Sequence, residues 1–202
     1  MKLKTLALAL VATTSLGISA TAVWAAEFNL TYSTTYSPTH PYGQADDEWI
    51  KRIHEQTNGR VEITAFWGGS LINSREGIDE LNAGVADMSY IAPIYASSGY
   101  DLNRLTPQFF YGYEDARDVL KVYMDLWDEY PQFTEELEGA QVLGYNVGTP
   151  MHLMLREKPF NQVSDLAGLR IRSAVDYIGA LTAAGAEGVT MPMTDTYPSL
   201  QR

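Results

Sequence analysis

The order of predicted strands and helices is the feature that most restricts how this chain can fold. Segments of alternating apolar and polar residues, the period of a strand, are separated by segments with apolar residues at three- and four-residue spacing, the period of a helix. The predicted strands are residues 28–32, 61–66, 88–91, 140–145, 151–155, 169–172 and 188–191. The predicted helices begin near residues 41, 73, 116, 177 and 194. This alternation is typical of α/β folds with a mainly parallel sheet.

Local signals indicate where the first two helices begin and end. Pro41 suits the first position of a helix, where its missing N–H costs nothing. Asn58 and Gly59 suit the left-handed conformation that ends a helix. Asn73 is followed three residues later by Glu76, a spacing that predicts a capping box at the start of the second helix.

The N-terminal segment, positions 1–25, has the pattern of a secretory signal peptide. Lys2 and Lys4 provide a positive start, positions 6–18 are mainly apolar, and the sequence VWA at 23–25 fits a cleavage site before Ala26. The apolar run is shorter than the roughly 20 residues of a membrane-spanning helix, which disfavours an uncleaved anchor. We therefore expect a periplasmic protein that is not inserted in the membrane after cleavage.

Composition restricts the partners of the mature chain. Removal of the predicted signal peptide takes away two of 14 basic residues and no acid, which leaves 12 against 25 acidic residues and a formal charge of −13. A surface this acidic disfavours nucleic acid and anionic membrane as partners, because both attract positive patches. The chain has no cysteine, so an exported protein of this sequence folds without disulfides.

Catalytic and metal-binding motifs are absent from the sequence. It contains no Gly-x-Ser-x-Gly elbow, no dinucleotide-binding glycine pattern and no phosphate-binding loop. The three histidines are scattered without metal-ligand spacing. Asp46, Asp47 and Glu48 are consecutive, so we expect them to form a solvated helix face rather than a metal site. The sequence predicts a protein that is not an enzyme and needs no cofactor or metal.

Candidate ligand-binding residues follow the predicted strands, because α/β sheets bind ligands at the carboxyl ends of their strands. These candidates are Thr35, Tyr36, His40, Trp67, Asn73 and Arg172. The aromatic residues favour a ligand with an apolar or ring face, although aromatic side chains in loops more often serve packing. His40 is expected to stabilise its own loop.

Arg172 is the strongest of these candidates. It ends a predicted strand and is followed by two small residues, so its planar guanidinium can point into a cleft and hold a carboxylate through two parallel hydrogen bonds. The competing interpretation is an exposed ion pair on an acidic surface, which contributes only about 0–1 kcal/mol. Spacing alone leaves both interpretations open.

Several motifs resemble the periplasmic receptors of tripartite ATP-independent (TRAP) transporters. The most specific are KPF at 158–160 and DLAGLRIR at 165–172. The others are THP at 39–41, GRVEI at 59–63, LNAGVADM at 81–88, GA at 185–186, MPM at 191–193 and YPSLQR at 197–202. The resemblance extends over residues 27–202.

This resemblance implies two α/β lobes with mainly parallel sheets that close on a small organic acid, followed by delivery to a sodium-driven TRAP permease. We expect the first lobe at residues 26–147 and the start of the second at 148–202, with Gly-Thr-Pro at 148–150 as the hinge. The resemblance also implies that Arg172 binds the ligand carboxylate. Lys158 is implied as a second basic group, and Thr35 and Asn73 as polar contacts from the first lobe.

Two features depart from the family pattern. Pro198 lies near the start of the last helix, and because proline is tolerated only in the first turn, we expect Thr194 or Asp195 to be the N-cap. Family members also continue for roughly another hundred residues. We therefore expect a C-terminally truncated chain whose second lobe has exposed sheet edges and an uncovered apolar face.

Three other functions compete with this interpretation. The protein could be a receptor for a different importer or for a sensor kinase, which the proteins that accompany it would reveal. A secreted α/β hydrolase would need a nucleophile and base that the residues do not provide, and turnover of esters or glycosides would reveal it. A merely structural exported domain would show no saturable ligand.

Overall fold

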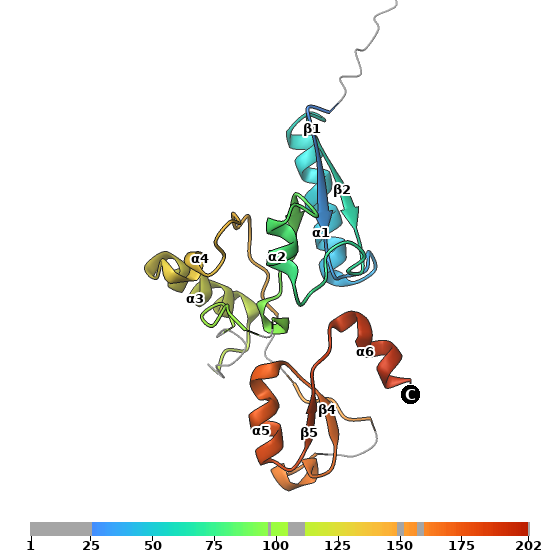
Figure 1. Ribbon diagram of the computed structural model, residues 1–202, viewed down its shortest axis with the longest axis vertical. Helices are drawn as coiled ribbons and strands as arrows, with labels where there is room; N and C mark the ends of the chain where they lie inside the picture. Colours follow the sequence, from blue (N-terminus) through green and yellow to red (C-terminus); the bar gives the residue numbers. More distant parts are fainter. Residues whose placement is uncertain (1–25, 97, 105–111, 149–151, 157–159, 202) are drawn as a thin grey trace, which may run out of the picture.

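A three-stranded parallel sheet organises the N-terminal half of the structure (Figure 1). The computed structural model describes residues 26–96, 98–104, 112–148, 152–156 and 160–201. The strands, in chain order, are β1 (Phe28–Ser33), β2 (Val61–Phe66), β3 (Met88–Ser89), β4 (Arg170–Arg172) and β5 (Glu187–Val189). The helices are α1 (Pro41–Gln56), α2 (Gly77–Asn82), α3 (Ala116–Glu129), α4 (Gln132–Glu135), α5 (Ile178–Ala183) and α6 (Met193–Leu200). Short 3-10 turns are η1 (Pro93–Tyr95), η3 (Val163–Leu166) and η4 (Val175–Tyr177).

β1 lies at the centre of the first sheet, in the order β2-β1-β3. Its pairing with β2 runs in register along the whole strand, from Phe28 opposite Val61 to Ser33 opposite Phe66. Tyr32 is buried beneath α1, where its ring meets Trp49 edge to face with ring centroids 5.6 Å apart. The predicted strand–helix–strand unit is therefore confirmed, and it presents the carboxyl ends of all three parallel strands at one edge.

The predicted helix signals are confirmed for α1 and wrong for α2. α1 begins at Pro41, and its chain reverses through Asn58 and Gly59, which have φ angles of 52° and 75°. α2 begins at Gly77 and has no side-chain cap. The Asn73 carboxamide oxygen accepts a hydrogen bond from the Arg75 N–H at 2.8 Å and forms a turn ahead of the helix. The short side chain of Asn73 is satisfied locally, so the capping box does not form.

The second sheet consists of β4 and β5, which pair in parallel (Figure 1). Leu166, Ile171 and Ala186 form a small core on which α5 packs through Leu181. α6 begins after Pro192, so the expected cap at Thr194 or Asp195 is wrong. Pro198 lies inside this helix; nearby, the Ser199 hydroxyl donates to the Asp195 carbonyl at 2.7 Å.

Two predicted strands are not formed. Residues 140–148 and 152–155 are irregular, and Met151 lies outside the described residues. A strand needs a neighbour for its backbone hydrogen bonds. Within the described residues these segments have none, and apolar side chains such as Leu143 and Met154 are exposed, the latter at 83%.

The described residues contain no helix that is both long and apolar enough to cross a membrane. The predicted signal peptide, residues 1–25, lies outside the described residues. The predicted division into lobes at residue 148 stays a prediction, because residues 149–151 also lie outside them.

Asp87 joins the segment before β3 to β1 through hydrogen bonds with Thr31. Its carboxylate accepts hydrogen bonds of 2.7 Å from both the N–H and the hydroxyl of Thr31, and the Asp87 N–H donates to that hydroxyl at 3.0 Å. These bonds favour the ionised form and lower the pKa of the Asp87 carboxyl. A carboxyl with a lowered pKa stabilises the folded state above its unfolded pKa, and this contribution is lost as pH falls through the folded pKa.

We therefore expect Asp87→Asn to make the protein less sensitive to acid. The free energy of unfolding, measured by urea denaturation at about pH 7 and about pH 3, should fall less between these values in the variant than in the wild-type chain. Asp47→Asn, which alters an exposed acid paired with Lys51 on α1, provides the comparison. Equal acid sensitivity of the wild type and Asp87→Asn would contradict the expectation.

Candidate functional site

The carboxyl ends of β1 and β3 carry a cluster of aromatic side chains. Tyr36 follows β1 and stacks on His40, with ring centroids 4.6 Å apart. Its ring also meets Tyr42 and Tyr90 edge to face at 4.9 and 5.0 Å. The Tyr36 hydroxyl donates to the Tyr90 hydroxyl at 3.2 Å. We call four of these side chains the tyrosine cluster: Tyr36, Tyr42, Tyr90 and Tyr95.

Burial affects two hydroxyls of the tyrosine cluster, those of Tyr36 and Tyr90. Burial raises the pKa of Tyr36 well above the usual range for a phenol, and the neighbouring tyrosines add to this rise. Burial also raises the pKa of Tyr90, so both hydroxyls are neutral. These hydroxyls therefore act as hydrogen-bonding groups and carry no negative charge that would repel an anion. His40 caps α1 by accepting from the Tyr42 N–H at 3.2 Å, as expected of a residue that stabilises its own loop.

Arg172, the last residue of β4, meets this cluster through Tyr95 at the end of η1. Its Nη2 donates to the Tyr95 hydroxyl at 2.8 Å, and its guanidinium carbon lies 5.8 Å from the centre of the Tyr95 ring. Nε and Nη2 also donate to the Met191 carbonyl, at 3.3 and 3.1 Å. Arg172 is half-buried, and each of these partners is a neutral oxygen.

The other predicted site residues are only partly brought together. Thr35 is buried two residues after the end of β1 and precedes Tyr36 in sequence. Trp67 is half-buried after β2, in the segment that approaches α6, where a Cβ added at Gly69 would lie 3.9 Å from the Thr194 methyl. Asn73 is exposed and uses its carboxamide within its own turn. Lys158 lies outside the described residues.

Asp46 is a residue that sequence reasoning places wrongly. The run of three acidic residues from Asp46 predicts a solvated helix face. In the structure Asp46 is instead half-buried, on the side of α1 that faces Tyr32 and Thr34. Burial raises the pKa of the Asp46 carboxyl, and the nearby Thr34 and Tyr32 hydroxyls offset part of this rise.

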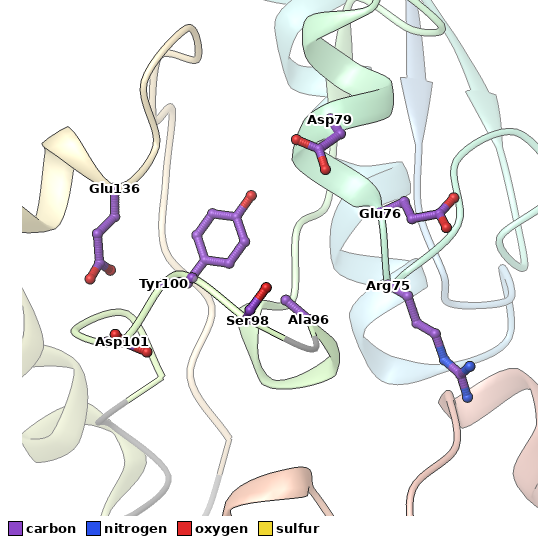
Figure 2. A pocket seen from close by; sticks show the side chains of 9 residues that line it. Arg75, Glu76, Asp79, Ala96, Ser98, Tyr100, Asp101 and Glu136 are labelled. Carbon is purple, nitrogen blue, oxygen red and sulfur yellow. The ribbon is translucent and has the colours of Figure 1, made fainter.

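A hollow of about 510 Å³ lies between α2 and the segment from Ser98 to Asp101 (Figure 2). Figure 2 shows Asp79 and Glu76 on one wall, and Tyr100 and Glu136 across from them. Its lining carries four carboxylates against one guanidinium. This charge repels an organic anion. The described residues hold no group of three or more metal-ligating side chains that could bind a metal there.

Glu136 has a structural role in this wall. Its carboxylate accepts from the Leu102 N–H at 2.8 Å, the Asn103 N–H at 3.0 Å and the Asn103 side chain at 2.8 Å. These bonds use most of the acceptor capacity of the carboxylate and fix the segment that leads to Arg104. An anionic ligand is therefore disfavoured in the hollow.

A buried ion pair connects the two sheet units close to this site. Arg104 follows the hollow in sequence, and its Nη2 donates to the carboxylate of Asp176 in η4, shortly after β4. Both side chains are almost completely buried. This pair and the Arg172–Tyr95 contact join the same two parts of the chain. Neither partner is identified from sequence.

Solved structures with the same fold are bacterial periplasmic proteins. A TRAP periplasmic solute binding protein from Bordetella bronchiseptica with bound (R)- and (S)-mandelate matches with a TM-score of 0.70 and 23% identity, over 86% of this chain and 55% of that one. One from Sulfurospirillum deleyianum with bound succinate matches with a TM-score of 0.59 and 22% identity, over 87% and 57%. This chain thus spans little more than half the length of these proteins. The likeness shows the α/β fold.

The family is shown by the sequence itself. Residues 32–202 match the family described as bacterial extracellular solute-binding protein, family 7. The matched range reaches from the end of β1 through α6 and contains the tyrosine cluster and Arg172. The chain therefore belongs to the bacterial extracellular solute-binding proteins of family 7.

Proposed function

We propose that this protein captures a small organic carboxylate in the periplasm and delivers it to a sodium-driven TRAP permease in the membrane. The observation that carries the proposal is the half-buried guanidinium of Arg172 at the carboxyl end of a parallel strand. Its hydrogen bonds in the structure go to neutral oxygens, so its positive charge is left for an anion.

The physical argument concerns the cost of holding a charge away from water. A partly buried guanidinium loses hydration, and an anionic ligand restores favourable interactions through charge-assisted hydrogen bonds. Such a bond contributes about 1.5–3 kcal/mol. The tyrosine cluster next to Arg172 supplies ring surface and neutral hydroxyls, which favour an acid with a ring or hydroxyl groups.

Proteins of the same fold support this class of ligand. The solved neighbours include proteins with bound mandelate, succinate, β-D-galacturonate, L-fuconate and L-gulonate, all of which are carboxylates. Two others hold diglycerolphosphate and sn-glycerol-3-phosphate. A screen must therefore include a phosphate ester beside the carboxylates.

The experiment is a thermal-shift screen of the purified chain against mandelate, succinate, gulonate, galacturonate and glycerol-3-phosphate. A ligand that binds only the native state raises its stability by about 2.7 kcal/mol at a hundredfold excess over Kd. We expect the melting temperature to rise with a carboxylate and to rise least with the phosphate ester. A chain that none of these compounds stabilises would contradict the proposal.

Arg172→Ala should weaken binding of the stabilising acid by at least about 10-fold, since one to two charge-assisted bonds are lost. Arg170→Ala is the matched control on the same strand. The Arg170 side chain is 72% exposed and pairs with Glu187 at 3.2 Å. Because an exposed pair of this kind contributes little, its loss should change Kd less than about twofold. Isothermal titration calorimetry measures both, and similar effects of the two substitutions would refute the role of Arg172.

A further inference from the structure

The hydrogen bonds of Arg172 leave one edge of its guanidinium for a ligand. The edge formed by Nε and Nη2 is directed at the Met191 carbonyl, to which both atoms donate. The remaining edge is formed by Nη1 and Nη2, and there Nη2 donates to the Tyr95 hydroxyl. Within the described part of the chain Nη1 has no hydrogen-bond partner. A carboxylate that approaches this edge therefore meets Nη1 and the Tyr95 hydroxyl together.

The Tyr95 hydroxyl is held in place with its own hydrogen still to donate. A phenol both accepts and donates a hydrogen bond. Its oxygen accepts from Arg172, and the cation lies over its ring at 5.8 Å, so two contacts fix the side chain. The described residues give the hydroxyl hydrogen no acceptor. A donor placed beside a cation interacts most favourably with an anion.

We propose that Tyr95 is a second ligand-binding residue, which donates its hydroxyl hydrogen to the carboxylate held by Nη1 of Arg172. This inference rests on the proposed function of anion capture and adds a specificity determinant to it. The phenol contributes direction without charge, so the site carries one positive charge and two donors. Such a site fits a carboxylate better than a doubly charged phosphate ester, whose second charge stays uncompensated.

Tyr95→Phe tests the proposal because it keeps the ring and its contact with the guanidinium but removes the hydroxyl. We expect the Kd values for mandelate and for succinate, measured by calorimetry on the whole chain, to rise about 10- to 150-fold, as for loss of a hydrogen bond to a charged group. Tyr130→Phe is the control, since Tyr130 is an exposed residue that ends α3. If the phenol competed with the ligand for Nη2, Tyr95→Phe would instead tighten binding, and this result would overturn the proposal.

Incorporation of 3-fluorotyrosine at position 95 separates donation from mere positioning of Arg172. Fluorine makes the phenol more acidic, which strengthens it as a donor and weakens it as an acceptor. At a pH where the phenol stays protonated, donation to the carboxylate predicts tighter binding, and a role only as acceptor for Arg172 predicts weaker binding. The second result overturns the proposal.

Arg172→Ala distinguishes failure of this inference from failure of the proposed function. If Arg172→Ala weakens binding and Tyr95→Phe does not, the carboxylate site stands and the role of Tyr95 is refuted. If neither substitution affects binding, or if wild-type protein binds neither mandelate nor succinate, both are refuted.

Discussion

Replacement of Arg104 by alanine is expected to lower the free energy of unfolding by about 3–5 kcal/mol, the loss typical when one partner of a buried ion pair is removed. The Arg104 and Asp176 side chains retain only 10% and 12% of their exposure. Arg104→Ala leaves the Asp176 carboxylate buried without its cation. The carboxylate must then stay ionised at high cost, take up a proton, or draw water into the interface.

A double substitution isolates this cost. Arg104→Met with Asp176→Leu removes both charges and keeps apolar volume, so the pair of changes should cost far less than Arg104→Ala alone. Lys121→Ala is the surface control, because Lys121 is 76% exposed and pairs with Asp125 at 2.9 Å one helical turn away. Exposed pairs of this kind contribute little, so its loss should be close to the limit of measurement. Urea denaturation measures all three, and an Arg104→Ala loss no larger than the control would contradict the prediction.

Much of the fold follows from local sequence pattern. β1, α1 and β2 are predictable to within about one residue, because each has strong periodicity and the helix has proline at its start and Asn-Gly after its end. Residues 140–145 and 151–155 have equally good alternation, but their described residues form no strand. Alternation describes which faces a strand would present, and pairing depends on distant segments that no local pattern contains.

The candidate site is predictable where it follows from strand ends. Arg172 and Tyr36 are identified because each comes at or just after the carboxyl end of a strand. Tyr95 lies in the turn that follows β3 and could be found by extending the same rule through that turn. Arg104 and Asp176 could not, since they are far apart in the sequence and only the tertiary fold brings them together. Asp46 is misplaced because the prediction grouped it with its neighbours in sequence, although it lies three residues before Trp49 and therefore on the same side of α1.

Gly43→Ala, in the first turn of α1, is expected to destabilise the protein by about 3 kcal/mol, the upper part of the usual range for overpacking. In an exposed helix the same change stabilises by about 1 kcal/mol, so the sign of the effect is informative. A Cβ at position 43 would lie 2.0 Å from the Ser37 carbonyl oxygen and 2.9 Å from its carbon. Both are backbone atoms, which cannot move aside by changing rotamer.

The loop that contains Ser37 must move to accommodate this Cβ, and the same loop also orders the site. The Ser37 carbonyl accepts from the His40 N–H at 3.0 Å, and His40 stacks on Tyr36. Gly43→Ala should therefore weaken carboxylate binding as well as stability. Gly179→Ala in α5 is the matched control, because a Cβ there meets no atom within 4 Å. Gly179→Ala should slightly raise the stability of the protein, because alanine favours a helix more than glycine does.

Thermal unfolding and calorimetry of the two glycine variants give the comparison. If Gly43→Ala raised stability as Gly179→Ala does, the close approach of Ser37 to α1 would not exist in solution, and the stacking of His40 on Tyr36 would need another explanation. If Gly43→Ala lowered stability but left carboxylate binding unchanged, the loop would support α1 alone, and the order of the tyrosine cluster would come from its own ring contacts.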